Sequence, residues 1–237
     1  MNTFLFDLDG SLLPLNEEEF VAIYFSGLCK AVSTYDFSHD DFLKALWHGI
    51  SAMRNNNGET TNEKVFWSAF SSALKYEDYK TLVALFMDYY RGDFDKTKKA
   101  IMPSPYAALS IKALKEKGYR LVLATNPLFP QIATYKRIKW AGLNPADFAL
   151  ITTFEHSYYC KPCLSYYQNI LRKLNVKAED CIMVGNDVEE DLVAARLGLD
   201  VYLLTECLIN SKKEDYSKIK NGKLKDLYQY ILTLPTI

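Results

Sequence analysis

Runs of apolar, β-prone residues alternate with amphipathic stretches along most of this chain. The apolar runs predict strands over residues 3–6, 119–124, 149–153, 181–185 and 201–205. Apolar residues at three- and four-residue spacing predict helices over residues 106–117, 131–140 and 187–198, a helix after Pro162 whose apolar face runs from Tyr166 to Leu174, and a final helix near the end of the chain. Strands that alternate with helices indicate an α/β fold, a doubly wound parallel Rossmann-like sheet with helices on both faces.

The stretch between the first strand and the rest is different, because no strand is indicated between about residues 15 and 100. Amphipathic helices are expected over 17–31, over 61–75 and over 76–91, and another begins after Ser38 with an apolar stripe that runs to Ile50. Asn16 is the expected first N-cap. We expect residues 15–100 to form a smaller, all-helical domain inserted into a core domain of residues 1–14 and 101–237. Its many aromatic residues are interpreted as the core of that domain.

Composition narrows the choice of partners. The chain has 237 residues, 49% of them hydrophobic, and a net charge of −1, so it carries no broad electrostatic case for nucleic acid or for an anionic membrane. No apolar run approaches the roughly 18 residues that a membrane span needs, and residues 1–3 lead into a strand. We therefore expect a cytoplasmic protein with a small-molecule partner, whose oligomeric state is not indicated.

Five cysteines are an odd number, which suits a reducing compartment. Cys160 and Cys163 have the spacing of a redox CxxC motif, but the surrounding thioredoxin-like pattern is missing. A zinc site that uses His156 with these two cysteines lacks a fourth ligand. Both alternatives stay open as minor hypotheses.

The first strand runs into two carboxylates, Asp7 and Asp9, and Gly10 then permits a sharp turn. Alternation along an extended segment would place both carboxylates on one side, where their like charges oppose joint ionisation unless a cation lies between them. Mg²⁺ is a suitable cation because it takes oxygen ligands and keeps water for a substrate phosphate. The plain alternative is a solvated strand end.

Residues 7–12, with the sequence DLDGSL, resemble the first signature of the haloacid dehalogenase superfamily, and Ser11 keeps the hydroxyl of the usual threonine. Thr125, at the end of the second core strand, resembles the second signature, whose hydroxyl contacts phosphate; free backbone amides there can bind phosphate as well. Lys161 and Pro162 resemble the third signature, although Cys163 stands where many members carry an acid or an amide.

The fourth signature is a glycine followed by two acids, which Gly185, Asp187 and Asp191 resemble. Four residues apart on a helix, Asp187 and Asp191 would share a face and converge on a cation. Asn186 intervenes after the glycine, so either Asn186 or Asp187 is the direct metal ligand, and the charge of Asp187 favours the latter. Glu189 and Glu190 are expected on a solvated helix face.

The resemblance implies a Mg²⁺-dependent phosphatase that hydrolyses a small phosphate monoester (sugar, glycolate or nucleotide-like) through an aspartyl-phosphate. It implies that Asp7 is the nucleophile and that Asp9 is the general acid and base. The implied phosphate-binding residues are Leu8, Thr125, Asn126 and Lys161; the implied metal ligands are Asp7, Asp9 through its carbonyl, Asn186, Asp187 and Asp191. It also implies that the helical insertion is a cap that selects the substrate.

Three other functions are alternatives to a phosphatase. A phosphomutase uses the same core and differs in how the cap holds a second phosphate or hydroxyl. A dehalogenase needs neither a protonated leaving group nor Mg²⁺, so Asp9 and the later acids count against it. A non-catalytic binding protein is the alternative from another class. Cap residues at helix ends could reach over the site but are expected on the surface: Arg54, Asn55, Lys64 and Arg91.

Overall fold

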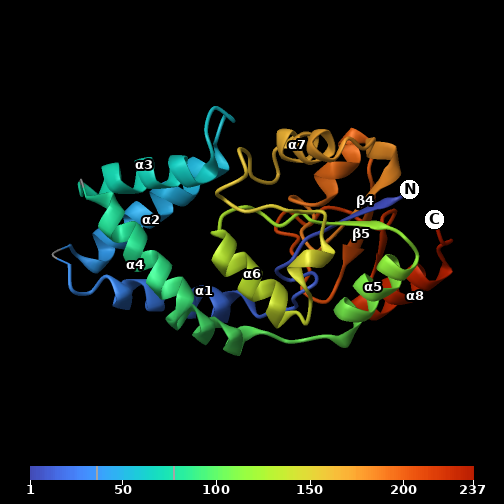
Figure 1. Ribbon diagram of the computed structural model, residues 1–237, viewed down its shortest axis with the longest axis horizontal. Coiled ribbons are helices and arrows are strands. Elements are labelled where there is room, and N and C mark those ends of the chain that lie inside the picture. Colours follow the sequence, from blue (N-terminus) through green and yellow to red (C-terminus); the bar gives the residue numbers. More distant parts are fainter. Residues whose placement is uncertain (36, 77) are drawn as a thin grey trace.

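A parallel six-stranded sheet carries the first strand at its centre in the computed structural model, which describes residues 1–35, 37–76 and 78–237 (Figure 1). The strand order is β3-β2-β1-β4-β5-β6. The strands are β1 (Thr3–Phe6), β2 (Arg120–Leu123), β3 (Leu150–Ile151), β4 (Cys181–Gly185), β5 (Asp200–Leu204) and β6 (Lys220–Gly222). Because β1 lies between β2 and β4, the residues that follow these three strands meet at one edge of the sheet.

Both faces of this sheet are covered, as a doubly wound fold requires. Alternation along β1 sends Phe4 and Phe6 into one hydrophobic cluster and Leu5 into the other. The first cluster includes residues of α5 (Pro105–Glu116) and α8 (Leu224–Thr233), and the second includes residues of α7 (Leu164–Leu174) and the 3₁₀ helix η4 (Leu192–Leu197). The predicted α/β class is therefore confirmed.

Four helices separate β1 from the rest of the sheet, and Figure 1 shows them as a distinct group beside it. They are α1 (Glu17–Ala31), α2 (His39–Arg54), α3 (Asn62–Leu74) and α4 (Tyr79–Arg91), followed by the 3₁₀ helix η1 (Asp93–Ala100). The predicted N-cap at Asn16 is confirmed, since its side chain accepts a hydrogen bond from the Glu19 amide. Phe42 and Phe70 lie fully buried among these helices.

The chain enters and leaves this helical group through two segments that lie side by side. The Asn16 amide donates to the Ala100 carbonyl at 2.9 Å, and the Met102 amide donates to the Pro14 carbonyl at 2.8 Å. A third connection comes from Asn62 at the start of α3, which is fully buried and donates through its side chain to the Pro127 carbonyl at 3.3 Å. The helical group is thus attached to the sheet near the strand ends.

Two edge strands differ from the sequence prediction. β3 has only two residues instead of the predicted five, although the amide of Thr152 still donates to the Leu123 carbonyl of β2 at 3.0 Å. The Thr152 hydroxyl donates to the Thr125 carbonyl at 2.6 Å. β6 was not predicted, since its sequence of Lys, Asn and Gly has no apolar pattern. The remaining helix of the core is α6 (Gln131–Trp140), which begins and ends as predicted.

Short 3₁₀ turns complete the core at η2 (Pro145–Asp147) and η3 (Ala178–Asp180). Among the described residues, no helix is both long enough and apolar enough to cross a membrane.

The central strand sets the stability of the core. Replacing Phe4, which is fully buried, by alanine should lower the free energy of unfolding by about 3–5 kcal/mol, because it removes a large apolar side chain and leaves a cavity. Urea denaturation followed by far-UV circular dichroism measures this change. The control Leu109→Ala on the exposed side of α5 should stay within about 0.5 kcal/mol. Equal effects of the two variants would contradict the placement of β1.

Candidate active site

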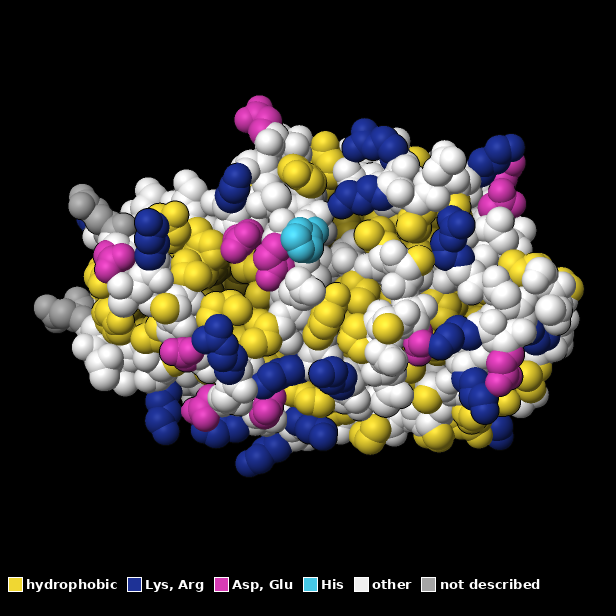
Figure 2. Space-filling view, in the orientation of Figure 1, with side chains coloured by type: hydrophobic (Ala, Val, Ile, Leu, Met, Phe, Trp, Pro, Cys, Tyr) yellow, Lys and Arg dark blue, Asp and Glu magenta, His cyan; other side chains and the backbone are white. Residues whose placement is uncertain are grey.

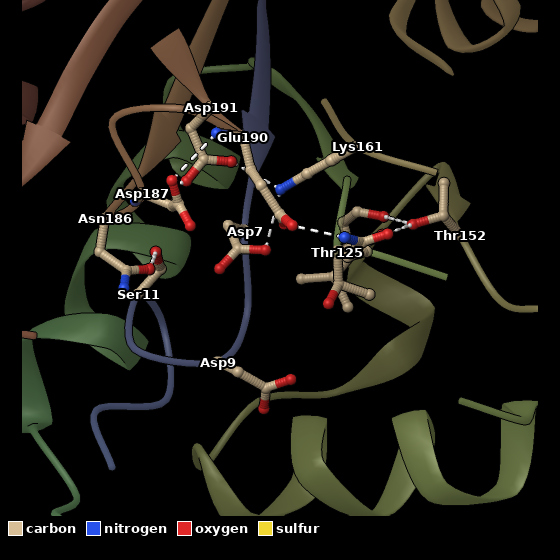
Figure 3. Close-up of polar contacts among 12 residues, drawn as sticks. Asp7, Asp9, Ser11, Thr125, Thr152, Lys161, Asn186, Asp187, Glu190 and Asp191 are labelled. Atoms are coloured by element: carbon tan, nitrogen blue, oxygen red, sulfur yellow. Dashed lines mark hydrogen bonds and ion pairs between the residues drawn. The ribbon is translucent and has the colours of Figure 1, made fainter. Parts of the chain in front are cut away.

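Asp7 lies directly after β1, in the middle of the sheet edge. Its amide still pairs with the Val184 carbonyl of β4 at 2.8 Å, so the backbone position is fixed by the sheet. Its carboxylate is almost buried and its Oδ1 lies 2.9 Å from the Nζ of Lys161 (Figure 3). A carboxylate held in this way points in one direction and is protected from bulk water.

Lys161 is only 1% exposed and contacts two carboxylates. Its Nζ lies 2.6 Å from Asp191 Oδ1 in addition to its contact with Asp7. Burial raises the pKa of Asp7 to about 7; the Lys161 charge opposes this shift, whereas the neighbouring carboxylates of Asp191 and Asp9 add to it. For Lys161, burial lowers the pKa, but the two carboxylates outweigh it and the pKa lies well above the usual value. Lys161 is therefore a permanent cation.

Asp191 reaches Lys161 through a close approach to β4. A Cβ at Gly185 would lie 2.0 Å from Asp191 Oδ2, so only glycine leaves room for this carboxylate. The same oxygen accepts the Asp187 amide at 3.0 Å. Both oxygens of Asp191 are thus engaged, one by Lys161 and the other by the backbone.

Asp187 and Asp191 do not lie on one face of an α-helix, and that prediction is wrong. The Asp187 Oδ1 accepts the amides of Glu189 at 2.8 Å and Glu190 at 3.0 Å, which bends residues 187–191 into turns. The 3₁₀ helix η4 begins only at Leu192. The Asp191 amide still donates to the Asp187 carbonyl at 2.9 Å, as in one helical turn, and the two side chains therefore come close together.

Asn186 packs against the turn that follows Asp7. Its Oδ1 accepts the Ser11 hydroxyl at 2.7 Å, and its Nδ2 donates to the Cys207 carbonyl at 2.7 Å. Gly10 has a φ of +76°, and a Cβ there would lie 2.4 Å from Asn186 Nδ2. Both facts require a glycine at position 10, so the DLDGSL turn and β4 are fitted to each other at this point.

Asp9 points away from Asp7, contrary to the expectation from strand alternation (Figure 3). β1 ends at Phe6, and the backbone turns before Asp9, so alternation no longer applies. The Asp9 Oδ2 forms an ion pair with the Nη1 of Arg137 on α6. Both aspartates nevertheless line one cavity of about 510 Å³.

Arg137 is a residue of the site that the sequence analysis did not identify. Its side chain is 0% exposed; it donates to the Ala133 carbonyl and to Thr134 Oγ1, each at 3.3 Å, and lies 4.2 Å from the centre of the Phe129 ring. The sequence did contain a signal for its burial, because Arg137 follows Ala133 by four residues and so lies on the same, core-facing side of α6. A buried arginine needs a carboxylate, and Asp9 is that partner.

The second strand brings Thr125 and Asn126 to the same cavity. The Thr125 carbonyl accepts the hydroxyls of Thr152 at 2.6 Å and Tyr166 at 2.9 Å, which fixes the turn after β2. Asn126 Nδ2 donates to Glu190 Oε2 at 2.8 Å. Glu190 is therefore not on a solvated face as expected, and burial raises its pKa.

Of the remaining predicted residues, Leu8 has a fully buried side chain, so only its backbone is available to a ligand. Among the four cap residues considered, Arg54 at the end of α2 lines the cavity and lies 3.6 Å from Glu190 Oε1. Asn55, Lys64 and Arg91 are exposed, as expected.

The CxxC cysteines are both free thiols in this structure, with Cys160 buried and Cys163 exposed. Burial raises the pKa of Cys160 to about 12, which keeps the thiol protonated and unreactive at neutral pH. His156 is exposed. Throughout the described part of the chain, no three His, Cys, Asp or Glu side chains are arranged to hold a metal ion by themselves, so the zinc alternative has no support.

The oxygen donors at the cavity nevertheless fit Mg²⁺. This ion takes one or two carboxylates together with water and substrate phosphate, so it does not require a cage of protein ligands. Asp7, Asn186 and Asp187 all line the cavity and supply carboxylate or amide oxygens. The donor set contains no sulfur or imidazole, which agrees with a hard cation.

Residues 1–198 match the family of haloacid dehalogenase-like hydrolases, so the chain belongs to this family and is a hydrolase. The resemblance carried by the four motifs is thereby confirmed. The solved structure of a HAD (haloacid dehalogenase) phosphatase from Thermococcus onnurineus has the same fold, with a TM-score of 0.62 and 18% identity over 100% of both chains.

Curated relatives match over most of their length. The chain is 25% identical over 235 residues to the glyceraldehyde 3-phosphate phosphatase of Methanocaldococcus jannaschii, covering 97% of this chain and 96% of that protein. It is also 25% identical over 210 residues to the ribulose-1,5-bisphosphate 5-phosphatase of Halopiger xanaduensis, covering 84% of this chain and 82% of that protein.

The buried ammonium of Lys161 yields a prediction about stability. Lys161→Met leaves Asp7 and Asp191 without their common cation, so the free energy of unfolding should fall by about 3–5 kcal/mol in the presence of a chelator. Urea denaturation gives this value. The control Lys112→Met removes an exposed pair with Glu116 and should change stability by less than about 0.5 kcal/mol. A Lys161→Met variant as stable as the control would exclude the buried triad.

Proposed function

We propose that the protein is a Mg²⁺-dependent phosphatase that hydrolyses a phosphate monoester through an aspartyl-phosphate on Asp7. The observation that carries this proposal is the Asp7 carboxylate, fixed at the end of the central strand by Lys161 and opening to a cavity that Thr125 and Asn126 also line. Membership of the hydrolase family and the phosphatase names of both curated relatives support it.

In the first step, an Asp7 oxygen attacks phosphorus, and the bond from phosphorus to the ester oxygen breaks. Lys161 holds a phosphate oxygen while charge redistributes, together with the Thr125 hydroxyl and the backbone amides of Leu8 and Asn126. Asp9, protonated at the start of this step on the oxygen that does not pair with Arg137, gives its proton to the leaving oxygen, which departs as the alcohol. In the second step, Asp9 removes a proton from water, which attacks phosphorus and releases inorganic phosphate with Asp7 regenerated.

Mg²⁺, when bound, would offset the repulsion between the Asp7 carboxylate and the substrate dianion. We assign its side-chain ligands to Asp7 and Asp187, with the Asp9 carbonyl as a further donor. The one side-chain oxygen of Asn186 already accepts the Ser11 hydroxyl at 2.7 Å, which favours Asp187 over Asn186. Asp191 was expected among the direct ligands, but both of its oxygens are already engaged. In this proposal, Asp191 acts on the site by positioning Lys161.

The helical residues 15–100 act as a cap in this proposal, attached to a core of residues 1–14 and 101–237. The paired segments at Asn16 and Ala100 and at Pro14 and Met102 support these boundaries. Arg54 on α2 brings a positive charge from the cap to the cavity that holds Asp7. The substrate would thus be enclosed between the two parts.

The experiment that tests this function is phosphate release from a panel of phosphomonoesters, with Mg²⁺ and with chelator. Release that depends on Mg²⁺ is expected. A bisphosphorylated sugar in the panel separates phosphatase from phosphomutase, because a mutase would convert it without net phosphate release. If the folded protein releases phosphate from no member of the panel, a non-catalytic binding protein becomes the favoured alternative.

Asp7→Asn should reduce turnover by roughly 10⁴-fold or more, because the amide oxygen is a poor nucleophile. The fold should persist, since the side-chain shape is kept and Lys161 still pairs with Asp191. Steady-state phosphate release and circular dichroism measure both quantities. Asp88→Asn on the exposed side of α4 serves as the matched control. Turnover near that of the control would remove Asp7 as nucleophile.

Asp9→Asn should lower turnover of alkyl phosphates by about 10²–10⁴-fold, the usual contribution of a general acid or base. A p-nitrophenyl leaving group needs no protonation, so its first step should survive while hydrolysis of the phosphoenzyme slows. Stopped-flow absorbance should therefore show a burst of one nitrophenolate per enzyme. A variant that turns over alkyl phosphates at the wild-type rate would rule out this role.

A further inference from the structure

A second cavity, of about 500 Å³, continues from the catalytic cavity into the helical cap. Several residues line both cavities, among them Asp9, Glu17, Arg54 and Asn186, so the two cavities adjoin each other beside the proposed general acid. A volume of this size is typical of small-molecule sites. The leaving group of a phosphate monoester bound at Asp7 would therefore lie in this second cavity.

The cap side of this cavity is lined mainly by aromatic and aliphatic side chains from all four cap helices. Among them are Phe25, Trp47, Ile50, Phe66, Trp67 and Val83. Figure 2 shows hydrophobic side chains around a hollow over α1–α4, with charged side chains at its rim. The interpretation of the aromatic residues as the core of this domain agrees with their burial, and several of them also line the cavity.

Trp47 is the clearest sign that this surface is built for a ligand. It is 54% exposed, and its ring packs edge-on against Phe25 with the ring centres 5.1 Å apart. Trp67 also lines the cavity and is 8% exposed, so it forms part of the wall and not of the surface.

The charges around the cavity disfavour a second anionic group on the ligand. Glu17, Glu63 and Glu155 line it, whereas Arg54 is the one basic side chain among the described lining residues. Arg54 already lies 3.6 Å from Glu190. A second phosphate or a carboxylate would meet repulsion here, and a sugar would leave most of its hydroxyls against hydrocarbon without hydrogen-bond partners.

We propose that the substrate is a phosphate monoester of an uncharged, apolar alcohol or phenol, whose apolar part fills the cavity lined by Phe25, Trp47 and Trp67. This inference rests on the proposed phosphatase function and specifies its substrate class. It differs from the small, polar or doubly phosphorylated compounds in the names of the curated relatives.

A series of primary alkyl phosphates tests this inference, because methyl, propyl and pentyl phosphate have leaving groups of similar basicity. The value of kcat/KM should rise about fourfold per added methylene, which corresponds to about 0.8 kcal/mol for each buried CH₂. Glycerol 3-phosphate, which has as many non-hydrogen atoms as pentyl phosphate, is the polar comparison. If kcat/KM for glycerol 3-phosphate equals or exceeds kcat/KM for pentyl phosphate, the inference is overturned while the phosphatase function stands.

Trp47→Ala should reduce the ratio of kcat/KM for pentyl over methyl phosphate by roughly fivefold or more, because apolar contact area is lost. The control Leu109→Ala changes an exposed apolar residue of α5 that does not line the cavity, so this ratio should stay at the wild-type value. An unchanged ratio in Trp47→Ala would contradict the proposed contact between this tryptophan and the apolar part of the substrate.

Binding provides a readout that does not depend on turnover. Trp47 and Trp67 both line the cavity, so ligand binding should change the tryptophan fluorescence. If no phosphate is released from any compound, the phosphatase function fails, and titration in the presence of Mg²⁺ still decides the inference. Tighter binding of pentyl phosphate than of glycerol 3-phosphate supports an apolar ligand. Equal or weaker binding overturns it.

Discussion

The buried ammonium of Lys161, held between Asp7 and Asp191, is the interaction on which the site depends. Three elements far apart in the sequence meet there, namely the end of β1, the loop before α7 and the turns after β4. Two carboxylates could not be buried together without a cation, and a buried lysine could not stay charged without them. The sheet therefore positions these three charged side chains, and their ion pairs in turn hold the three elements together.

Close packing at two glycines allows this arrangement. Gly185 leaves space for Asp191 beside β4, and Gly10 leaves space for Asn186 beside the turn after β1. These contacts bring oxygen donors to one cavity while Arg137 holds Asp9 on the side toward the cap. In the proposed mechanism, Asp9 then lies beside the oxygen of the leaving group, where a general acid is required.

Much of the fold was predictable because its signals are local. The apolar run of β1, the N-cap at Asn16 and the helical spacing of α6 depend on neighbours in the sequence, and the structure confirms them. Asp9 and Arg137 could not be paired from sequence, since the turn after β1 ends the alternation and the partner lies on a distant helix. The cavity among the inserted helices could not be predicted either, because aromatic spacing is the same for a packed core and for a ligand site.

The central claim is that Asp7 is the nucleophile of a phosphatase, and the most direct measurement is peptide mapping by mass spectrometry after acid quenching during turnover. The enzyme would be mixed with Mg²⁺ and a phosphate monoester that it hydrolyses, quenched within milliseconds and digested in acid. The account predicts one added phosphoryl group on the peptide that contains Asp7, lost on treatment with hydroxylamine. A phosphoryl group on another residue, or none at any time during turnover, would contradict it.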